Sequence, residues 1–123
     1  MIQNANVSVK DMQTGLEALK KFPDVTMYIV PEATLLTSGD NPTIMQDMLA
    51  QCGAMQTAMT IFDIIGGENP DPITWTDDIT NFRNSTGNND LKYGSAYYPF
   101  LNTTIVTSDL VDYTNINGGI QPC

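Results

Sequence analysis

The chain has 123 residues, enough for one domain, and 41% of them are hydrophobic, which supplies a core but falls short of membrane composition. Fourteen acidic residues against five basic ones give a net charge of -9, which repels phosphate backbones and anionic lipid headgroups. We therefore expect a soluble single domain that binds neither nucleic acid nor a membrane directly.

The two ends of the chain and its cysteines set further bounds. The N-terminal stretch MIQNANVSVK lacks the apolar core of a secretory signal, so we expect a cytoplasmic origin. Cys52 and Cys123 are too far apart to form a metal or redox pair, and Cys52 reads as a small apolar residue on a helix. The final stretch TNINGGIQPC contains loop signals but no helix or strand, so we expect a fragment of a longer protein.

The first predicted elements are a helix and a strand. Asp11 can cap a helix that ends near Phe22, since apolar residues recur between them at helical spacing. The run from Val25 to Val30 is short, apolar and rich in β-branched residues, and Pro31 closes it. This pattern predicts a strand buried on both faces.

The next pair is again a helix followed by a strand. Asn41 is the expected cap and Pro42 the expected first residue of a helix that continues from Thr43 to about Gln56. Its apolar stripe consists of Ile44, Met45, Met48, Leu49, Cys52 and Met55. We expect the five methionines on or near the sheet and this helix to fill the core. Residues 58–65 then predict a second buried strand.

The third pair completes an alternating pattern. After a loop from Gly66 to Pro72, a helix is expected from Thr74 to a stop at residues 87–89. A strand from Leu91 follows, with a bulky face, a nearly smooth small-residue face that suggests close packing, and an end at Pro99. This order predicts an α/β fold with a mostly parallel sheet and crossover helices. Residues 103–106 and 110–113 are further candidate strands.

Little catalytic chemistry is visible. The chain has no histidine, which removes the common general base and every Ser-His or Cys-His nucleophile. Asp63 is the sharpest catalytic candidate, because doubly wound folds place their sites at the carboxyl ends of central strands. We favour a structural interpretation, in which the amides of the following turn bind its carboxylate. Gly66 and Gly67 lack the spacing of a nucleotide loop, so no cofactor is expected.

Charged residues near the third helix allow two interpretations each. Asp71, Asp77 and Asp78 could bind a hard cation, but acids in a first turn also stabilise the helix dipole, which we favour. Arg83 could bind a carboxylate, although an ion pair along the helix or across an interface is favoured. No metal site is therefore predicted.

Four segments together resemble the contractile tail sheath family of bacteriophage tails and phage-derived injection systems. They are LEALKKFPDVTMYIVPEA, the helix end LAQCG, the strand AMTIFDI and FRNSTGNNDLKYGSAYYPFL. The most specific part is a small-residue strand that ends in two aromatic residues, Pro and a further aromatic residue. The motif positions are Asp63, Leu91, Lys92, Tyr93, Gly94, Ala96, Tyr97, Tyr98 and Pro99. None of them is catalytic in the family, and Asp63 matches the Asp that closes its second strand.

The resemblance implies a subtilisin-like α/β core without the triad, and a structural protein rather than an enzyme. Subunits of this kind assemble in the cytoplasm as stacked rings around an inner tube, connect to a baseplate, and contract to drive the tube through a target membrane. The expected partners are other copies of the chain, the tube protein and the baseplate. Nothing after Val106 is long enough to supply the family's arm-exchanging terminal domain, which again indicates a fragment.

Two other functions stay open. The chain could be a small cytoplasmic α/β enzyme that uses Asp63 near the Gly66-Gly67 loop. It could also be an adaptor that binds a basic partner through its acidic face.

Overall fold

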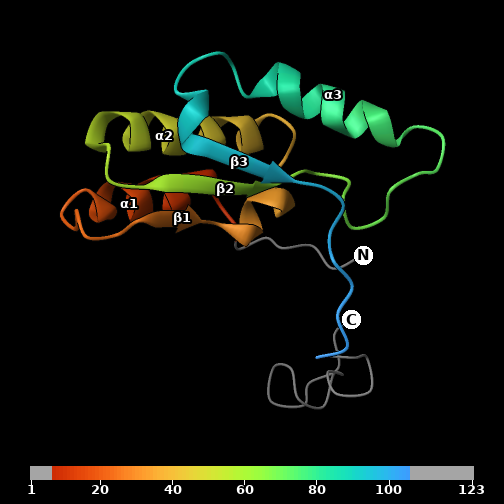
Figure 1. Cartoon of the computed structure of the whole chain (residues 1–123), viewed down its shortest axis with the longest axis horizontal. Helices are drawn as coiled ribbons and strands as arrows, with labels where there is room; N and C mark the ends of the chain where they lie inside the picture. Colours follow the sequence, from red (N-terminus) through yellow and green to blue (C-terminus); the bar gives the residue numbers. More distant parts are fainter. Residues whose placement is uncertain (1–6, 106–123) are drawn as a thin grey trace.

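The structure is a computed structural model that describes residues 7–105 (Figure 1). Helices and strands alternate along this part of the chain, as the sequence predicts. The elements are α1 (Val9–Leu19), β1 (Met27–Ile29), the 3-10 helix η1 (Pro31–Leu35), α2 (Asp40–Met55), β2 (Met59–Asp63), α3 (Trp75–Ser85), the 3-10 helix η2 (Leu91–Tyr93) and β3 (Gly94–Tyr97). None of the described helices is long and apolar enough to cross a bilayer.

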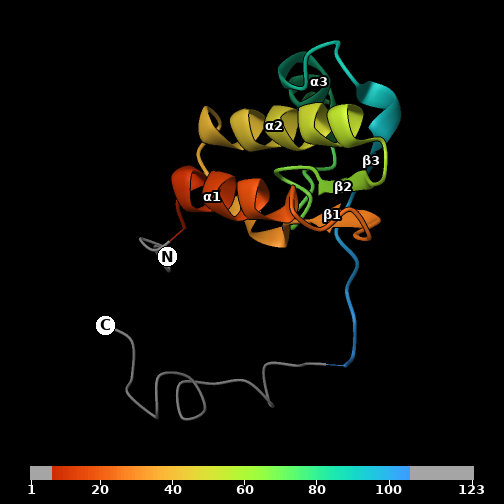
Figure 2. The same ribbon diagram turned by 90° about the vertical axis from the view of Figure 1, so that its left-hand side faces the viewer.

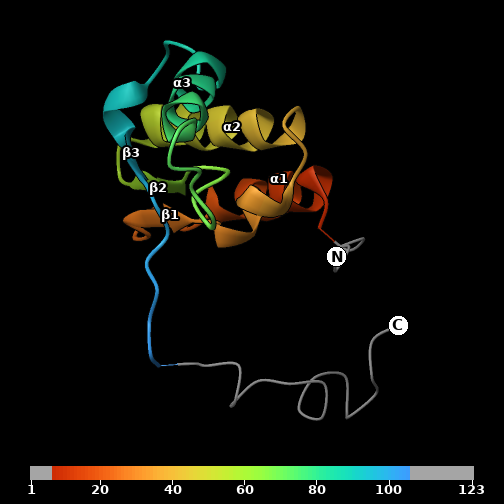
Figure 3. The ribbon, with the colours of Figure 1, turned by 90° about the vertical axis from the view of Figure 1, so that its right-hand side faces the viewer.

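The three strands form one parallel sheet in the order β1-β2-β3. Met27 of β1 lies opposite Met59 of β2, and Thr60 of β2 lies opposite Gly94 of β3. This confirms a small parallel α/β domain. Figures 2 and 3 show that all three helices lie on the same side of the sheet, with α1 and α2 side by side and α3 beyond α2.

The core lies between α2 and the covered face of the sheet. The buried residues of the hydrophobic core are Leu16, Tyr28, Ala33, Leu36, Ile44, Met45, Met48, Leu49, Cys52 and Phe62. The predictions that Cys52 is buried and that methionines fill the core are therefore confirmed for Cys52, Met45 and Met48. The same prediction is wrong for Met27 and Met59, which are 53% and 39% exposed. Buried Gln51 donates to the Leu16 carbonyl oxygen at 2.8 Å and to the Tyr28 hydroxyl at 3.1 Å, which ties α1, α2 and β1 together.

The predicted cap of α2 is wrong. The helix begins at Asp40, so Asn41 lies inside its first turn, where its buried side chain donates to the Ala33 carbonyl oxygen at 2.7 Å. The Thr37 hydroxyl instead accepts from the Asp40 amide at 3.1 Å. A side chain upstream of the helix thus takes over the capping role and leaves Asn41 free to fasten α2 to η1.

Two expectations about the strands are also corrected. Met27 and Ile29 are 53% and 55% exposed, so β1 is buried on one face only, because helices cover a single face of the sheet. The strand predicted from Leu91 begins only at Gly94, since Asp90 has a left-handed backbone with φ 58° and its carbonyl accepts from the Tyr93 amide at 3.0 Å.

The last strand ends before the proline, as predicted. β3 stops at Tyr97, and the Tyr98-Pro99 peptide bond that follows is cis. The candidate strand at 103–106 is not formed over its described part, residues 103–105. The candidate strand at 110–113 and Cys123 lie outside the described residues.

Candidate functional site at the carboxyl edge of the sheet

The sheath-like motif and the predicted catalytic candidate meet where the strands end. Asp63, the last residue of β2, lies opposite Tyr97, the last residue of β3. Just beyond them, the Phe100 amide donates to the Gly67 carbonyl oxygen at 2.9 Å. The fold therefore brings together Asp63, the glycine pair and the aromatic end of the motif.

Asp63 is exposed, and its carboxylate makes no hydrogen bond within the part of the chain that the structure describes. The amides of the following turn bond to backbone carbonyls instead: Gly67 donates to Ile64 at 3.1 Å and Asn69 to Gly66 at 3.3 Å. The expectation that these amides hold the Asp63 carboxylate is therefore wrong. These turn amides are satisfied by backbone carbonyls, so the Asp63 carboxylate stays exposed.

The glycine pair is packed against other protein groups. Gly66 has φ +95°, and a Cβ atom placed there would lie 2.5 Å from an Asp78 carboxylate oxygen. A Cβ atom on Gly67 would lie 2.7 Å from the Phe100 ring. The glycines thus permit a left-handed turn and close contacts within the fold. The space beside them is occupied by Asp78 and Phe100.

Tyr98 joins the end of β3 to the start of α3. Its hydroxyl donates to Asp78 Oδ2 at 2.9 Å, and its ring stacks on Trp75 with the centroids 6.5 Å apart and an interplanar angle of 23°. Desolvation raises the pKa of Tyr98, and the hydrogen bond to Asp78 and the negative charges of Asp78 and Glu68 raise it further. The second aromatic residue of the motif is therefore an anchor between two elements.

The acidic residues of this region organise the start of α3. Asp71 Oδ1 accepts from the amides of Ile73 at 2.7 Å and Thr74 at 3.0 Å, and these bonds lower the pKa of Asp71. Asp77 and Asp78 lie in the first turn of α3, where negative charge is favourable. Within residues 7–105 no group of three or more acidic, Cys or His side chains is placed to hold a metal ion.

The predicted close packing of the smooth face is confirmed at Gly94. A Cβ atom there would lie 2.7 Å from Leu49 Cδ2 and 3.2 Å from Phe62 Cε2, so β3 approaches α2 more closely than any other residue type would allow. On the same strand, Ala96 lies opposite Phe62 of β2. Gly94 therefore serves contact between helix and sheet, whereas Ala96 is exposed.

The other two charged candidates, Lys92 and Arg83, form no ion pair at this site within residues 7–105. Lys92 of the motif lies over the Tyr93 ring, 5.3 Å from its centroid. Across residues 7–105 the one ion pair joins Lys20 and Glu17 at 2.6 Å, so the expected pairing of Arg83 along α3 is not found there.

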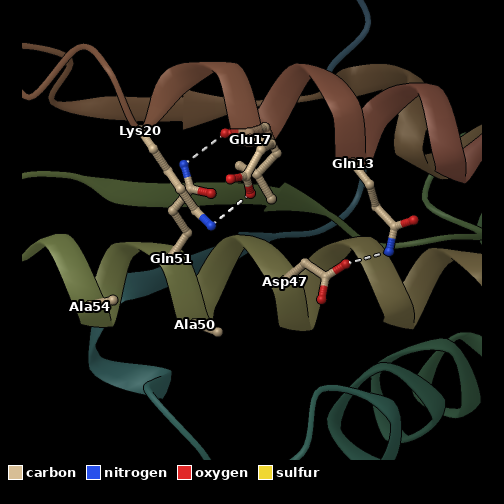
Figure 4. A pocket seen from close by; sticks show the side chains of 8 residues that line it. Gln13, Glu17, Lys20, Asp47, Ala50, Gln51 and Ala54 are labelled. Carbon is tan, nitrogen blue, oxygen red and sulfur yellow. Dashed lines mark hydrogen bonds and ion pairs between the residues drawn. The ribbon is translucent and has the colours of Figure 1, made fainter.

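A second polar region, missed by the sequence reasoning, lies between α1 and α2 (Figure 4). This groove has a volume of about 420 Å³ and is lined by side chains that include Ala50 and Ala54. Gln13 donates to Asp47 at 2.6 Å across it. Its polar groups bond to one another, and no nucleophile with an adjacent base is present in it. Residues 34 positions apart give no sequence signal of such a pair.

Comparisons with models of protein families and with curated protein sequences find no match for this chain.

Proposed function

We propose that the chain is the α/β part of a structural subunit of a contractile sheath, which assembles as stacked rings around an inner tube. The observation that carries the proposal is how the motif residues are used. Gly94 lets β3 approach α2, Tyr98 fastens β3 to α3, and Phe100 fills the space beside Gly67. A stretch in which Gly94, Tyr98 and Phe100 serve packing suits a rigid subunit better than a ligand site.

The fold is compatible with the subtilisin-like core that sheath subunits resemble. A parallel sheet with crossover helices is the shared architecture, and the absence of histidine from the sequence agrees with a core that lacks the triad. The subunit would assemble in the cytoplasm and act in a virion tail or a phage-derived injection particle. Its partners would be other copies, the tube protein and the baseplate, without a cofactor, a nucleic acid or a direct membrane contact.

The mechanism requires a stiff body whose interfaces have two arrangements. In the extended sheath each subunit would be held in a metastable packing, and a signal from the baseplate would release it into a wider and shorter sheath of lower free energy. A small difference per interface suffices, because many subunits change together. The domain itself need perform no chemistry and only has to keep its shape.

An α/β enzyme is the second candidate, and one observation favours it. Asp63 is exposed at the carboxyl end of the middle strand, where open α/β sheets place ligands. Against this, Asp78 and Phe100 occupy the space beside the glycine loop that a substrate would need. The sheath proposal therefore stands first.

Negative-stain electron microscopy of the complete product of the gene that encodes these residues distinguishes the sheath proposal from the enzyme candidate. Long tubes or ring stacks are expected from the sheath proposal, with Asp63→Asn assembling like the natural protein. A product that stays monomeric under all conditions, and has a turnover that Asp63→Asn abolishes while circular dichroism is unchanged, would replace the sheath by the enzyme.

A further inference from the structure

The face of the sheet opposite the helices is apolar and uncovered in the part of the chain that the structure describes. We call the surface formed by Met27, Ile29, Met59, Ile61, Asp63, Ser95 and Tyr97 the open sheet face. Met27 and Met59 lie opposite each other in register, as do Ile29 and Ile61, so the apolar side chains form rows across the strands. Parallel sheets usually have both faces covered, which makes this surface unusual.

The topology explains why the described elements leave this face open. α2 connects β1 to β2, and α3 connects β2 to β3, so both connections step across the sheet in the same direction. Right-handed crossovers in one direction place their helices on one face. α1 lies beside α2 on that same face (Figure 2). A cover for the open sheet face must therefore come from outside these elements.

The dimensions of the face match one helix. Three strands spaced about 4.8 Å apart give a surface roughly 10 Å wide, close to the diameter of an α-helix with its side chains. Met27, Ile29, Met59 and Tyr97 are between 39% and 59% exposed. Together these four side chains expose on the order of 400 Å² of surface. A stable pair of copies needs about 800 Å² from each partner, so a second copy on this face alone is a poor fit.

The charge around the face indicates the character of the helix. Residues 22–82 supply β1, β2 and the loops at their ends, and this stretch contains nine acidic and no basic residues. Asp63 lies on the face itself, in register with Tyr97. Glu32 and Glu68 follow β1 and β2 in the chain, at the end of the sheet where Asp63 lies. A second copy would bring like charges together, whereas Lys or Arg side chains would be attracted.

We propose that the open sheet face is the docking surface for a single amphipathic α-helix of another polypeptide, which carries Lys or Arg beside its apolar stripe. The apolar side chains of the helix, at positions i, i+3, i+4 and i+7, would lie on the rows of Met27, Ile29 and Met59. Its basic side chains would extend along the apolar surface toward Asp63 and Glu68. This inference does not depend on the sheath proposal.

A designed 18-residue helix of Leu and Lys in amphipathic order is a direct probe, with the same pattern in Leu and Glu as its counterpart. Fluorescence anisotropy with the full 123-residue chain should detect binding of the Leu/Lys peptide and at least tenfold weaker binding of the Leu/Glu peptide. Ile29→Gln should weaken binding of the Leu/Lys peptide at least tenfold. Ile73→Gln is the matched control, because Ile73 is 87% exposed outside this face. Equal effects of the two substitutions would overturn the proposal.

The charge contribution has its own pair of variants. Asp63→Asn should weaken binding of the Leu/Lys peptide about threefold or more. Asp11→Asn should leave binding unchanged, because Asp11 is an exposed residue of α1, on the other side of the sheet. Circular dichroism of each variant shows that its fold is retained. If both variants bind as the natural chain does, the acidic residues of this face do not select the helix, and the proposal of a basic partner is wrong.

Methionine oxidation gives an independent readout of the same surface. In the free chain hydrogen peroxide should oxidise Met27 and Met59, whereas Met45 and Met48, each 1% exposed, should resist. Mass spectrometry should show that the Leu/Lys peptide slows oxidation of Met27 and Met59 at least fivefold. Protection without any peptide would overturn the proposal: if it is independent of protein concentration, another part of this chain covers the face, and if it rises with concentration, a second copy does.

Discussion

Replacing Gly94 by Ala should destabilise the domain, because the strand has no room for a methyl group at this position. The added Cβ atom would lie 2.7 Å from Leu49 Cδ2 and 3.2 Å from Phe62 Cε2. Leu49 is 2% exposed and cannot turn toward solvent. Overpacking of this kind costs about 1–3 kcal/mol. The lower backbone entropy of alanine in the unfolded chain offsets about 0.5–1 kcal/mol.

The expected result is a loss of about 0.5–2 kcal/mol in the free energy of unfolding, measured by urea titration with circular dichroism at 222 nm. Gly15→Ala is the matched control. Gly15 lies inside α1, and no atom lies within 4 Å of an added Cβ, so alanine should stabilise the domain by about 0.5–1 kcal/mol. The change from Gly to Ala should thus lower the free energy of unfolding at Gly94 and raise it at Gly15.

A double-mutant cycle identifies the contact responsible. Leu49→Ala removes the Cδ2 atom, so Gly94→Ala should be less destabilising in that background, with a coupling of about 0.5–2 kcal/mol. The reasoning is refuted if Gly94→Ala is neutral or stabilising. It is also refuted if the two substitutions are additive, because the loss would then have a source other than contact with α2.

Three further predictions concern titratable groups. Because the pKa of Tyr98 is raised above its ordinary 10.0, its contribution to stability is complete below that pH and is lost as pH rises through the folded pKa; Tyr98→Phe should remove this alkaline loss and the late phenolate transition in absorbance at 295 nm. The pKa of Asp71 is lowered from 3.8, so its contribution is present above that pH and is lost on acidification through the folded pKa; Asp71→Asn should flatten the acid limb of the stability profile, with carboxyl NMR shifts as the check. Burial raises the pKa of Cys52, so in a Cys123→Ser background iodoacetamide should label it at least a hundredfold more slowly than in urea-unfolded chain.

The sequence allowed the order of the elements and the parallel sheet to be predicted. The apolar stripe of α2 and the alternation of helix and strand depend on the local spacing of apolar residues, which can be read from the sequence. Burial of β1 on both faces could not be judged in this way, since the apolar run from Val25 to Val30 does not say whether a second layer is present. The late start of β3 depends on one left-handed residue, Asp90, which no pattern identified.

The site was predicted in part. Asp63 and the aromatic end of the motif were each singled out from the sequence, but their proximity was not predicted, because it requires β2 and β3 to be neighbours in the sheet. The hydrogen bond between Tyr98 and Asp78 did not follow, since it depends on how α3 returns across the sheet. The role of Asp71 as the acceptor for the amides that precede α3 also depends on the path of a single turn.

The parallel sheet has a consequence for how the domain folds. Neither of its strand pairings joins segments that are close along the described chain: Met27 pairs with Met59, and Thr60 with Gly94. Each pairing closes a loop of more than thirty residues, which costs about 3 kcal/mol in chain entropy before any strand contact forms. The helix α2 lies between β1 and β2 in the chain and supplies much of the core. We therefore expect α2 to form early in folding and to shorten the loop that must close before β1 pairs with β2. Destabilising the middle of α2 should then slow folding, whereas trimming β1 should mainly speed unfolding.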